Sequence, residues 1–187
     1  MATPNYILKT TEDIDVLKNP GERKIKKAIL IILIVIIVAS FIFGENLFGE
    51  LNFMAKIILL GLVFGVLFVN KKETKQFPLE LRFYEDKIEV IRHEVHYSNG
   101  DVKQEFYVFP FDGNPSCTYA ERSRLTRIRG MAHGEWYKYT KDGFIAEKPE
   151  RVRDMQGICY FNLSQSADVN LPNILKQYTP IKVDIEK

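Results

Sequence analysis

Cysteine and net charge are both scarce in this chain. Its 187 residues include only Cys117 and Cys159, without a C-x-x-C pair, and its formal net charge is +2. We expect both thiols to be reduced packing residues rather than a disulfide. Acidic and basic residues are nearly balanced from Gln76 onward. Because nucleic-acid-binding domains usually carry a basic field, we expect no nucleic acid partner.

The usual catalytic and cofactor motifs are also missing. No serine stands in G-x-S-x-G, no glycine loop is suited to a phosphate, and no carboxylate pair stands in an apolar segment. His93 and His96 lie three residues apart on an expected strand, so they face opposite sides and cannot share a metal ion. His133 lies between Gly130 and Gly134 and is expected in a loop. We therefore predict a protein that is not an enzyme and holds no metal or cofactor.

Two long apolar runs dominate the N-terminal part. Residues 28–43 are apolar except for Ser40, and residues 53–69 are apolar except for Lys56. With its flanks each run reaches about 20 residues, enough to span a hydrocarbon core of about 30 Å as a helix. A cleaved signal peptide or a soluble buried hairpin fits less well, because the first run lacks a cleavage site and a polar face. The runs predict a transmembrane helical hairpin.

The predicted domains follow from these runs. Residues 1–22 form an N-terminal segment, residues 23–76 form the hairpin with spans at about 24–43 and 52–70, and residues 77–187 form one further domain. Basic residues flank both spans, and the loop between them has none. The excess of positive charge predicts a two-span protein of the cell membrane with both termini in the cytoplasm. The flanking basic residues are Arg23, Lys24, Lys26, Lys27, Lys71, Lys72 and Lys75.

Two glycines of the second run are candidates for helix packing. Gly61 and Gly65 are four residues apart, which on a helix lets a neighbouring helix approach closely. The neighbour is either the first span of the same chain or a second copy. Lys56 is expected near the outer end of the span, where its ammonium group reaches the interface.

Residues 77–187 show the pattern of an antiparallel β domain that ends in a helix. Short alternating apolar runs are separated by turn residues, including Asn99-Gly100, and a shift of apolar parity predicts a bulge within 88–95. Asn170 and Pro172 begin a short helix that ends before Pro180. The fold class is therefore α+β: a helical hairpin and then a β barrel or sandwich. The expected strands are 79–83, 88–95, 102–109, 117–120, 125–130, 135–140 and 157–163.

This layout resembles the pleckstrin-homology-like domain. The segment 83–90 is similar to the first hairpin of bacterial members, and 109–130 is similar to their middle strands. Residues 6–13 resemble the extended segment before the two spans of the YcxB-like family of bacterial membrane proteins. The resemblance implies a hairpin anchor followed by a pleckstrin-homology-like domain. One departure is that the final helix lacks tryptophan, since the only one is Trp136 on an expected strand.

Arginines gather in one part of the β domain. They offer a lipid- or partner-binding surface, since each basic residue near a membrane adds about 1 kcal/mol of attraction to anionic headgroups. A solvated hairpin whose arginines pair with neighbouring acids is the alternative. The acidic first hairpin at Glu85-Asp86 argues against carrying phosphoinositide binding over from the fold. The candidate residues are Arg122, Arg124, Arg127, Arg129, Arg151 and Arg153.

The functional hypothesis combines these observations. We predict a non-catalytic interaction module, anchored in the membrane, that binds a protein partner or a second copy of itself. One alternative is direct binding of anionic lipid headgroups through the arginines. Another is an immunity or accessory subunit of a membrane complex that acts through the hairpin. Tyr6 to Leu8 are also expected to be able to add a strand to the β domain.

Overall fold

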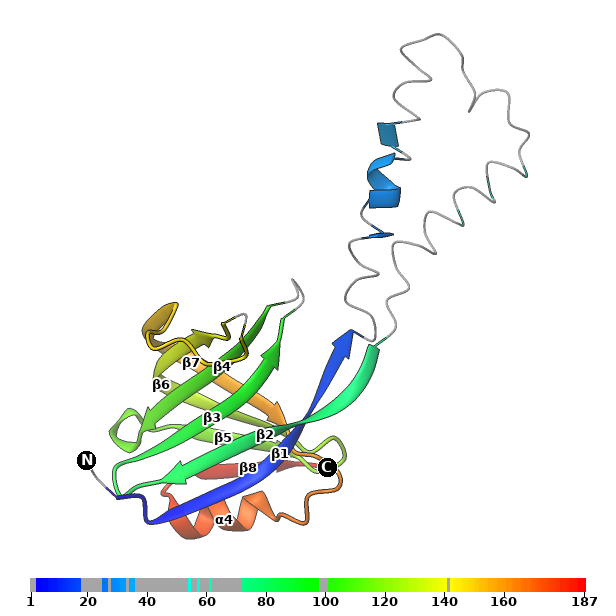
Figure 1. Ribbon diagram of the computed structural model, residues 1–187. Helices are drawn as coiled ribbons and strands as arrows, with labels where there is room; N and C mark the ends of the chain where they lie inside the picture. Colours follow the sequence, from blue (N-terminus) through cyan, green and yellow to red (C-terminus); the bar gives the residue numbers. More distant parts are fainter. Residues whose placement is uncertain are drawn as a thin grey trace. The chain divides into compact units, whose positions relative to one another are not determined.

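Alternating apolar residues form long strands through most of the chain that the structure describes (Figure 1). The computed structural model describes residues 3–17, 25–26, 28–32, 34–35, 54, 57, 61, 72–97, 101–140 and 142–187. It has two compact units, one of Met1–Asp15 with Thr74–Lys187 and one of Val16–Glu73. The elements are β1 (Tyr6–Leu17), β2 (Lys72–Phe83), β3 (Lys87–His96), β4 (Val102–Pro110), the 3-10 helix η1 (Phe111–Gly113), β5 (Ser116–Ala120), β6 (Leu125–Lys138), β7 (Arg151–Asn162), α4 (Leu171–Tyr178) and β8 (Lys182–Glu186).

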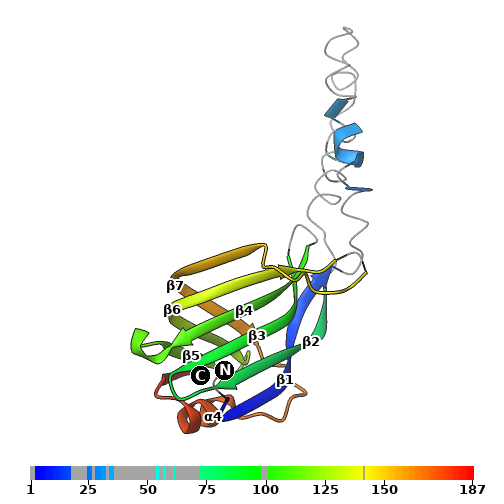
Figure 2. The same cartoon turned by 60° about the vertical axis from the view of Figure 1, so that its left-hand side comes forward.

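The strands belong to one strongly curled sheet. Its order is β1-β2-β3-β4-β6-β5-β8, and β7 pairs with β6 outside this path (Figure 2). The partners of β6 explain the branching. β7 pairs with β6 from Leu125↔Asn162 to Trp136↔Arg151 and so occupies one edge of β6 as far as Trp136. The other edge is shared, because β5 takes its first part and β4 its last part.

Regular alternation divides the sheet into an inner and an outer face. Even-numbered residues of β6 from Thr126 to Trp136 are buried, and odd-numbered residues from Gly157 to Phe161 of β7 are buried. The inner face holds the apolar core, which includes Phe83, Phe109 and Phe161. Because successive side chains of a strand point to opposite faces, the odd-numbered residues of β6 and the even-numbered residues of β7 form the outer face.

The C-terminal helix α4 packs against this core. Leu171 and Leu175 are fully buried, and Tyr178 stacks on Tyr6 of β1 with ring centroids 4.5 Å apart. The Asn170 side chain accepts a hydrogen bond from the Asn173 N–H at 3.2 Å and caps the helix. The predicted helix is confirmed at this place.

Several predicted strands differ from those observed. The bulge in β3 is confirmed, because the register shifts between Arg92 and Val95. The two strands predicted at 125–130 and 135–140 are instead the single strand β6, so His133 lies in a strand and not in a loop. The strand predicted at 157–163 begins earlier, as β7 from Arg151, and β8 was not predicted. β1 extends well beyond the segment Tyr6 to Leu8 that was expected to add a strand.

Glycines caused the error in β6. A Cβ atom at Gly134 would lie 2.8 Å from the Trp136 indole, and one at Gly130 would lie 3.1 Å from Pro115 Cα. Both glycines therefore allow a close approach inside a strand rather than a turn. Sequence alone does not distinguish these two reasons for glycine.

The predicted fold class requires a larger correction. In the parts of the chain that the structure describes, no helix is long and apolar enough to cross a membrane. These parts are mainly β, with the short helices α4 and η1 and a few helical residues between 25 and 61. This contradicts the predicted α+β fold with a transmembrane helical hairpin, and with it the predicted location as a two-span protein of the cell membrane.

The reason lies in what hydropathy measures. The spans predicted at about 24–43 and 52–70 fall mostly outside the described residues. An apolar run records composition only, whereas a span also needs an unbroken helix of about 20 residues. Apolar composition was therefore not sufficient to predict a membrane-spanning pair.

Candidate functional site

The six candidate arginines do not form one cluster, and Arg124 illustrates why. Its backbone is left-handed, with a φ of 54° at the end of the β5–β6 turn. Its guanidinium donates to the backbone carbonyls of Ser164, Ala167 and Val169 at 2.7 to 2.9 Å. Arg124 therefore holds the loop between β7 and α4 in place rather than offering a free positive charge.

The other five arginines face different directions. Arg122 is exposed in the same turn. Arg127 and Arg129 lie on the outer face of β6, and Arg127 Nη1 is 3.6 Å from a carboxylate oxygen of Glu186. Arg151 and Arg153 lie at the start of β7, in register with Trp136 and Gly134 of the inner face. The six arginines thus lie in the β5–β6 turn, against the loop before α4, on the outer face of β6 and on the inner-face side of β7. They do not form a single surface for a lipid headgroup.

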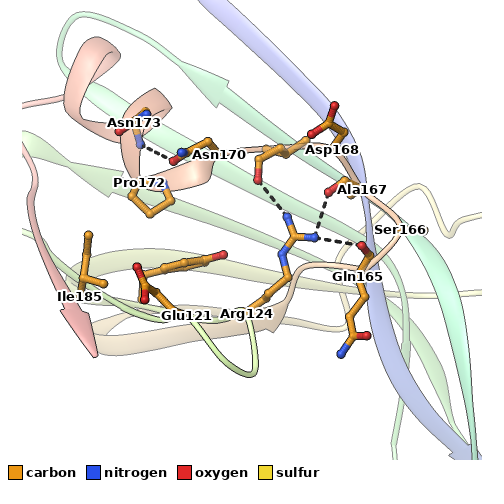
Figure 3. Close-up of a pocket in the computed structure, with 12 residues that line it drawn as sticks. Glu121, Arg124, Gln165, Ser166, Ala167, Asp168, Asn170, Pro172, Asn173 and Ile185 are labelled. Carbon is orange, nitrogen blue, oxygen red and sulfur yellow. Dashed lines mark hydrogen bonds between the residues drawn. The ribbon is translucent and has the colours of Figure 1, made fainter. Parts of the chain in front are cut away.

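Figure 3 shows the pocket beside Arg124. Its volume is about 580 Å³, and its walls come from the β5–β6 turn, the loop 165–170, the first turn of α4 and β8. Tyr119, Pro172 and Ile185 supply apolar walls, while Glu121 and Asp168 bring carboxylates. Neither carboxylate forms an ion pair with a residue that the structure describes. The pocket has no buried polar group without a partner, so its geometry does not select a ligand.

A buried charged network lies inside the curled sheet. Arg92 of β3 donates to both carboxylate oxygens of Glu12 on β1, with Nη2 to Oε2 at 2.8 Å. Its Nη1 donates to Glu105 of β4 at 2.9 Å. The side chains of Glu12, Arg92 and Glu105 are nearly or fully buried. Tyr97 and Tyr107 donate their hydroxyls to Glu105. This set is called the inner network below.

Burial and charge shift the pKa values in the inner network. Burial raises the pKa of the Glu12 carboxyl, and the charge and hydrogen bonds of Arg92 only partly oppose this. Burial opposes the charge of Arg92, but its carboxylate partners outweigh burial and raise its pKa. Burial also raises the pKa of the neighbouring Cys159 thiol and brings that of Cys117 to about 12. Both cysteines are free, buried and poor nucleophiles, which confirms them as reduced packing residues.

The sequence pattern does not predict the inner network. Glu12 is separated from Arg92 by 80 positions in the chain, so no local spacing joins them. One signal was present: Glu12 is four residues after buried Leu8 in β1 and therefore shares its inner face. The pattern of a buried network tying three strands together indicates a structural role.

A second polar chain lies on the outer face of β6 and β7. His133 Nδ1 is 2.6 Å from Asp154 Oδ1, and His133 Nε2 is 3.1 Å from Glu135 Oε1. Tyr137 donates its hydroxyl to Glu135. The hydrogen bonds from Asp154 and then Glu135 raise the pKa of His133. With a carboxylate at each nitrogen the imidazole is held as a donor at both, so it is unsuited to act as a base.

Apolar side chains are exposed beside this chain. Tyr160 and Ile158 of β7 have exposed fractions of 61% and 51%, and Met131 of β6 has 47%. Arg129 is in register with Ile158 and has no ion pair with any residue that the structure describes. Tyr160, Ile158, Met131 and Arg129 are called the outer patch below. Tyrosine and arginine beside aliphatic side chains are typical of protein-binding surfaces.

The remaining predicted site residues stay predictions. A Cβ atom at Gly61 would meet nothing within 4 Å, and Gly65 lies outside the described residues. Among the described residues no group of three or more histidines, cysteines or acids is placed to hold a metal ion.

Comparison of the chain with protein-family models, curated proteins and solved structures finds no match. The resemblance to the YcxB-like family and to the pleckstrin-homology-like domain therefore stays a prediction.

Proposed function

We propose that this protein is a non-catalytic interaction module that binds another protein through the outer patch. The observation that carries the proposal is the high exposure of Tyr160, Ile158 and Met131 on one face of adjacent strands. Isolated exposed apolar residues are common on protein surfaces, but neighbouring ones beside an arginine that has no ion pair with the described residues favour a binding surface.

The rigidity of the patch supports this proposal. β6 is paired on both edges, and β7 is paired with β6 along twelve residue positions. The patch therefore lies on a sheet and needs little ordering when a partner binds, which lowers the entropic cost of association. Its tyrosine also supplies a large contact area with few rotatable bonds.

The chemistry of the other candidate groups favours binding over catalysis. The thiols are buried with raised pKa values, and the exposed His133 is held between Asp154 and Glu135. The six candidate arginines lie on different parts of the domain. The structure therefore supports lipid binding through all six less well than it supports protein binding at the outer patch.

The experiment is the isolation of the tagged full-length chain from its own cells, followed by rebinding of any stoichiometric protein in purified form. The double variant Tyr160→Ser with Ile158→Ser is expected to weaken this binding at least about tenfold, or 1.4 kcal/mol. The matched control is Ile7→Ser with Phe144→Ser, which removes two other exposed apolar side chains and is expected to bind normally.

Two results would overturn the proposal. One is equal binding by the parent chain and the outer-patch variant. The other is the conversion of a defined small molecule by the purified full-length chain, since that would make it an enzyme. Circular dichroism of both double variants confirms that lost binding does not reflect lost folding.

A further inference from the structure

One edge of β7 has no strand partner in the described chain. β7 pairs with β6 along its whole length, and just beyond its end Leu163 makes a bridge to Glu12 of β1. No backbone hydrogen bond joins residues 151–162 to any described residue on the side away from β6. This side is called the open edge of β7 below. An unpaired edge presents N–H and C=O groups that another extended chain can pair with.

The open edge lacks the usual protection over part of its length. Natural edge strands are commonly guarded by charge, proline or a bulge. Residues 156–162 have the sequence QGICYFN, with neither charge nor proline, and β7 has no register shift against β6. Three of these residues are β-branched or aromatic, and such residues favour strand pairing. This half of the edge is therefore suited to accept a strand.

The other half of the open edge specifies the partner's charge. Arg151 and Arg153 are two residues apart and therefore point to the same face. Both are exposed, and neither forms an ion pair with a residue that the structure describes. Arg151 lies over the Trp136 ring, 5.3 Å from its centroid. On an added strand, two carboxylates at alternate positions would lie opposite these guanidinium groups at cross-strand distance.

A second copy of β7 fits this edge poorly. In the antiparallel registers that pair most of the strand, Arg153 would lie opposite Cys159 or Phe161, which are buried apolar residues of the inner face. In a parallel register each arginine would lie opposite another arginine. Both arrangements leave the arginines without a counter-charge, whereas an acidic strand supplies it.

We propose that the open edge of β7 binds an extended acidic segment of a partner protein as an added strand. Two alternating carboxylates of the segment pair with Arg151 and Arg153, and its apolar residues lie beside Ile158 and Tyr160. This inference rests on the proposed function, because the added strand would border the outer patch. It names the class of partner: an extended peptide with alternating acidic residues followed by β-branched ones.

The test uses the full-length chain and the synthetic peptide acetyl-TEVEVTVTVTVT-amide, which in a parallel register with its glutamates opposite Arg151 and Arg153 places valines opposite Ile158 and Tyr160. Titration calorimetry is expected to show binding of this peptide and at least about tenfold weaker binding of acetyl-TKVKVTVTVTVT-amide. The double variant Arg151→Glu with Arg153→Glu is expected to reverse this preference. The control variant Arg122→Glu with Lys182→Glu makes the same change of charge at exposed residues away from the open edge, and is expected to keep the preference.

Hydrogen exchange distinguishes an added strand from a loose electrostatic contact. The acidic peptide is expected to slow amide exchange within residues 151–162, because pairing protects the edge amides. Binding without that protection would overturn the inference, as would equal affinity for the two peptides. Sedimentation that shows a dimer lost on Arg151→Glu with Arg153→Glu would also overturn it, because a second copy would then occupy the edge.

The two proposals fail separately. If the outer-patch variant loses its protein partner but the acidic peptide does not bind, the proposed function stands and the edge inference fails. In the opposite case the peptide binds and protects β7, but the outer-patch variant keeps its protein partner. The outer patch is then not the binding surface, and the edge inference does not describe how that partner binds.

Discussion

Arginines of the inner network and of the outer face of the same sheet differ in burial and in their ion pairs. Arg92 lies between two buried carboxylates, whereas Arg129 on the outer face has no ion pair among the described residues. A buried charge depends strongly on its partners because water cannot replace them. An exposed charge depends on them little, since water solvates it and salt screens it. Stability is thus concentrated inside the sheet, which leaves the outer face free for binding.

The largest expected effect is the loss of the central cation. Arg92→Met leaves Glu12 and Glu105 buried without a counter-charge, so we expect the free energy of unfolding to fall by about 3–5 kcal/mol. Urea unfolding followed by circular dichroism measures it. The control Arg127→Met removes the arginine of an exposed outer-face pair, with Glu186 3.6 Å away, and is expected to cost less than about 1 kcal/mol. An equal loss of unfolding free energy in the two variants would contradict the proposed difference between buried and exposed ion pairs.

The next largest effect concerns the close approach at Gly134. Gly134→Ala places a Cβ atom 2.8 Å from the Trp136 indole, which is held by Tyr107 and Arg151. We expect the free energy of unfolding to fall by about 1–3 kcal/mol, because the buried ring has to move. The control Gly157→Ala meets its nearest atom at 3.5 Å, an ordinary contact, and is expected to change stability by less than about 1 kcal/mol. Similar thermal unfolding of both variants would contradict this account.

The pH dependence of the inner network gives a smaller effect. Burial raises the pKa of Glu12 above its ordinary 4.5, so the folded state keeps a proton that the unfolded state loses. The stabilising contribution is full below about pH 4.5 and is lost as the pH rises through the folded pKa. The parent chain is therefore expected to gain stability relative to Glu12→Gln as the pH falls from neutral. A relative loss of stability over that range, measured by urea unfolding, would reverse the sign of this effect.

The smallest expected effect belongs to the outer face. Hydrogen bonds to Asp154 and Glu135 raise the pKa of His133, so its contribution is present below about pH 6.5 and is lost as the pH rises through the folded pKa. The side chain is partly exposed, and we expect His133→Gln to cost roughly 0.2–1 kcal/mol at about pH 5.5 and less at about pH 8.5. A constant cost at both pH values would show that His133 acts through packing alone.

Local patterns predicted part of this fold correctly. The capping residue Asn170 and the early Pro172 located α4, and the slip of apolar parity located the bulge between Arg92 and Val95. These succeed because capping and strand alternation depend on neighbours within a few residues. The same reasoning failed at Gly134, where glycine is required because the Trp136 ring packs against it in the folded chain. It also failed to predict that β8 pairs with β5.

The candidate site was predicted less well than the strands. The sequence placed the arginines close together in number, but β-alternation and the loop around Arg124 separate them in space. The outer patch was not predicted, because exposure of Tyr160 and Ile158 depends on which face of β7 is covered. The prediction of a transmembrane hairpin was wrong, because no helix in the described residues is long and apolar enough to cross a membrane. Apolar composition alone does not specify a long helix.

The sequence by itself determined where most strands alternate, where α4 begins, and that the two cysteines are free packing residues, because these follow from local periodicity, capping and composition. Only the tertiary structure decided that Glu12, Arg92 and Glu105 meet in the interior. It also decided that one edge of β7 lacks a strand partner among the described residues. The physical reason is that burial and edge pairing are properties of strands brought together from distant parts of the chain, and no short segment contains both sides of such a contact.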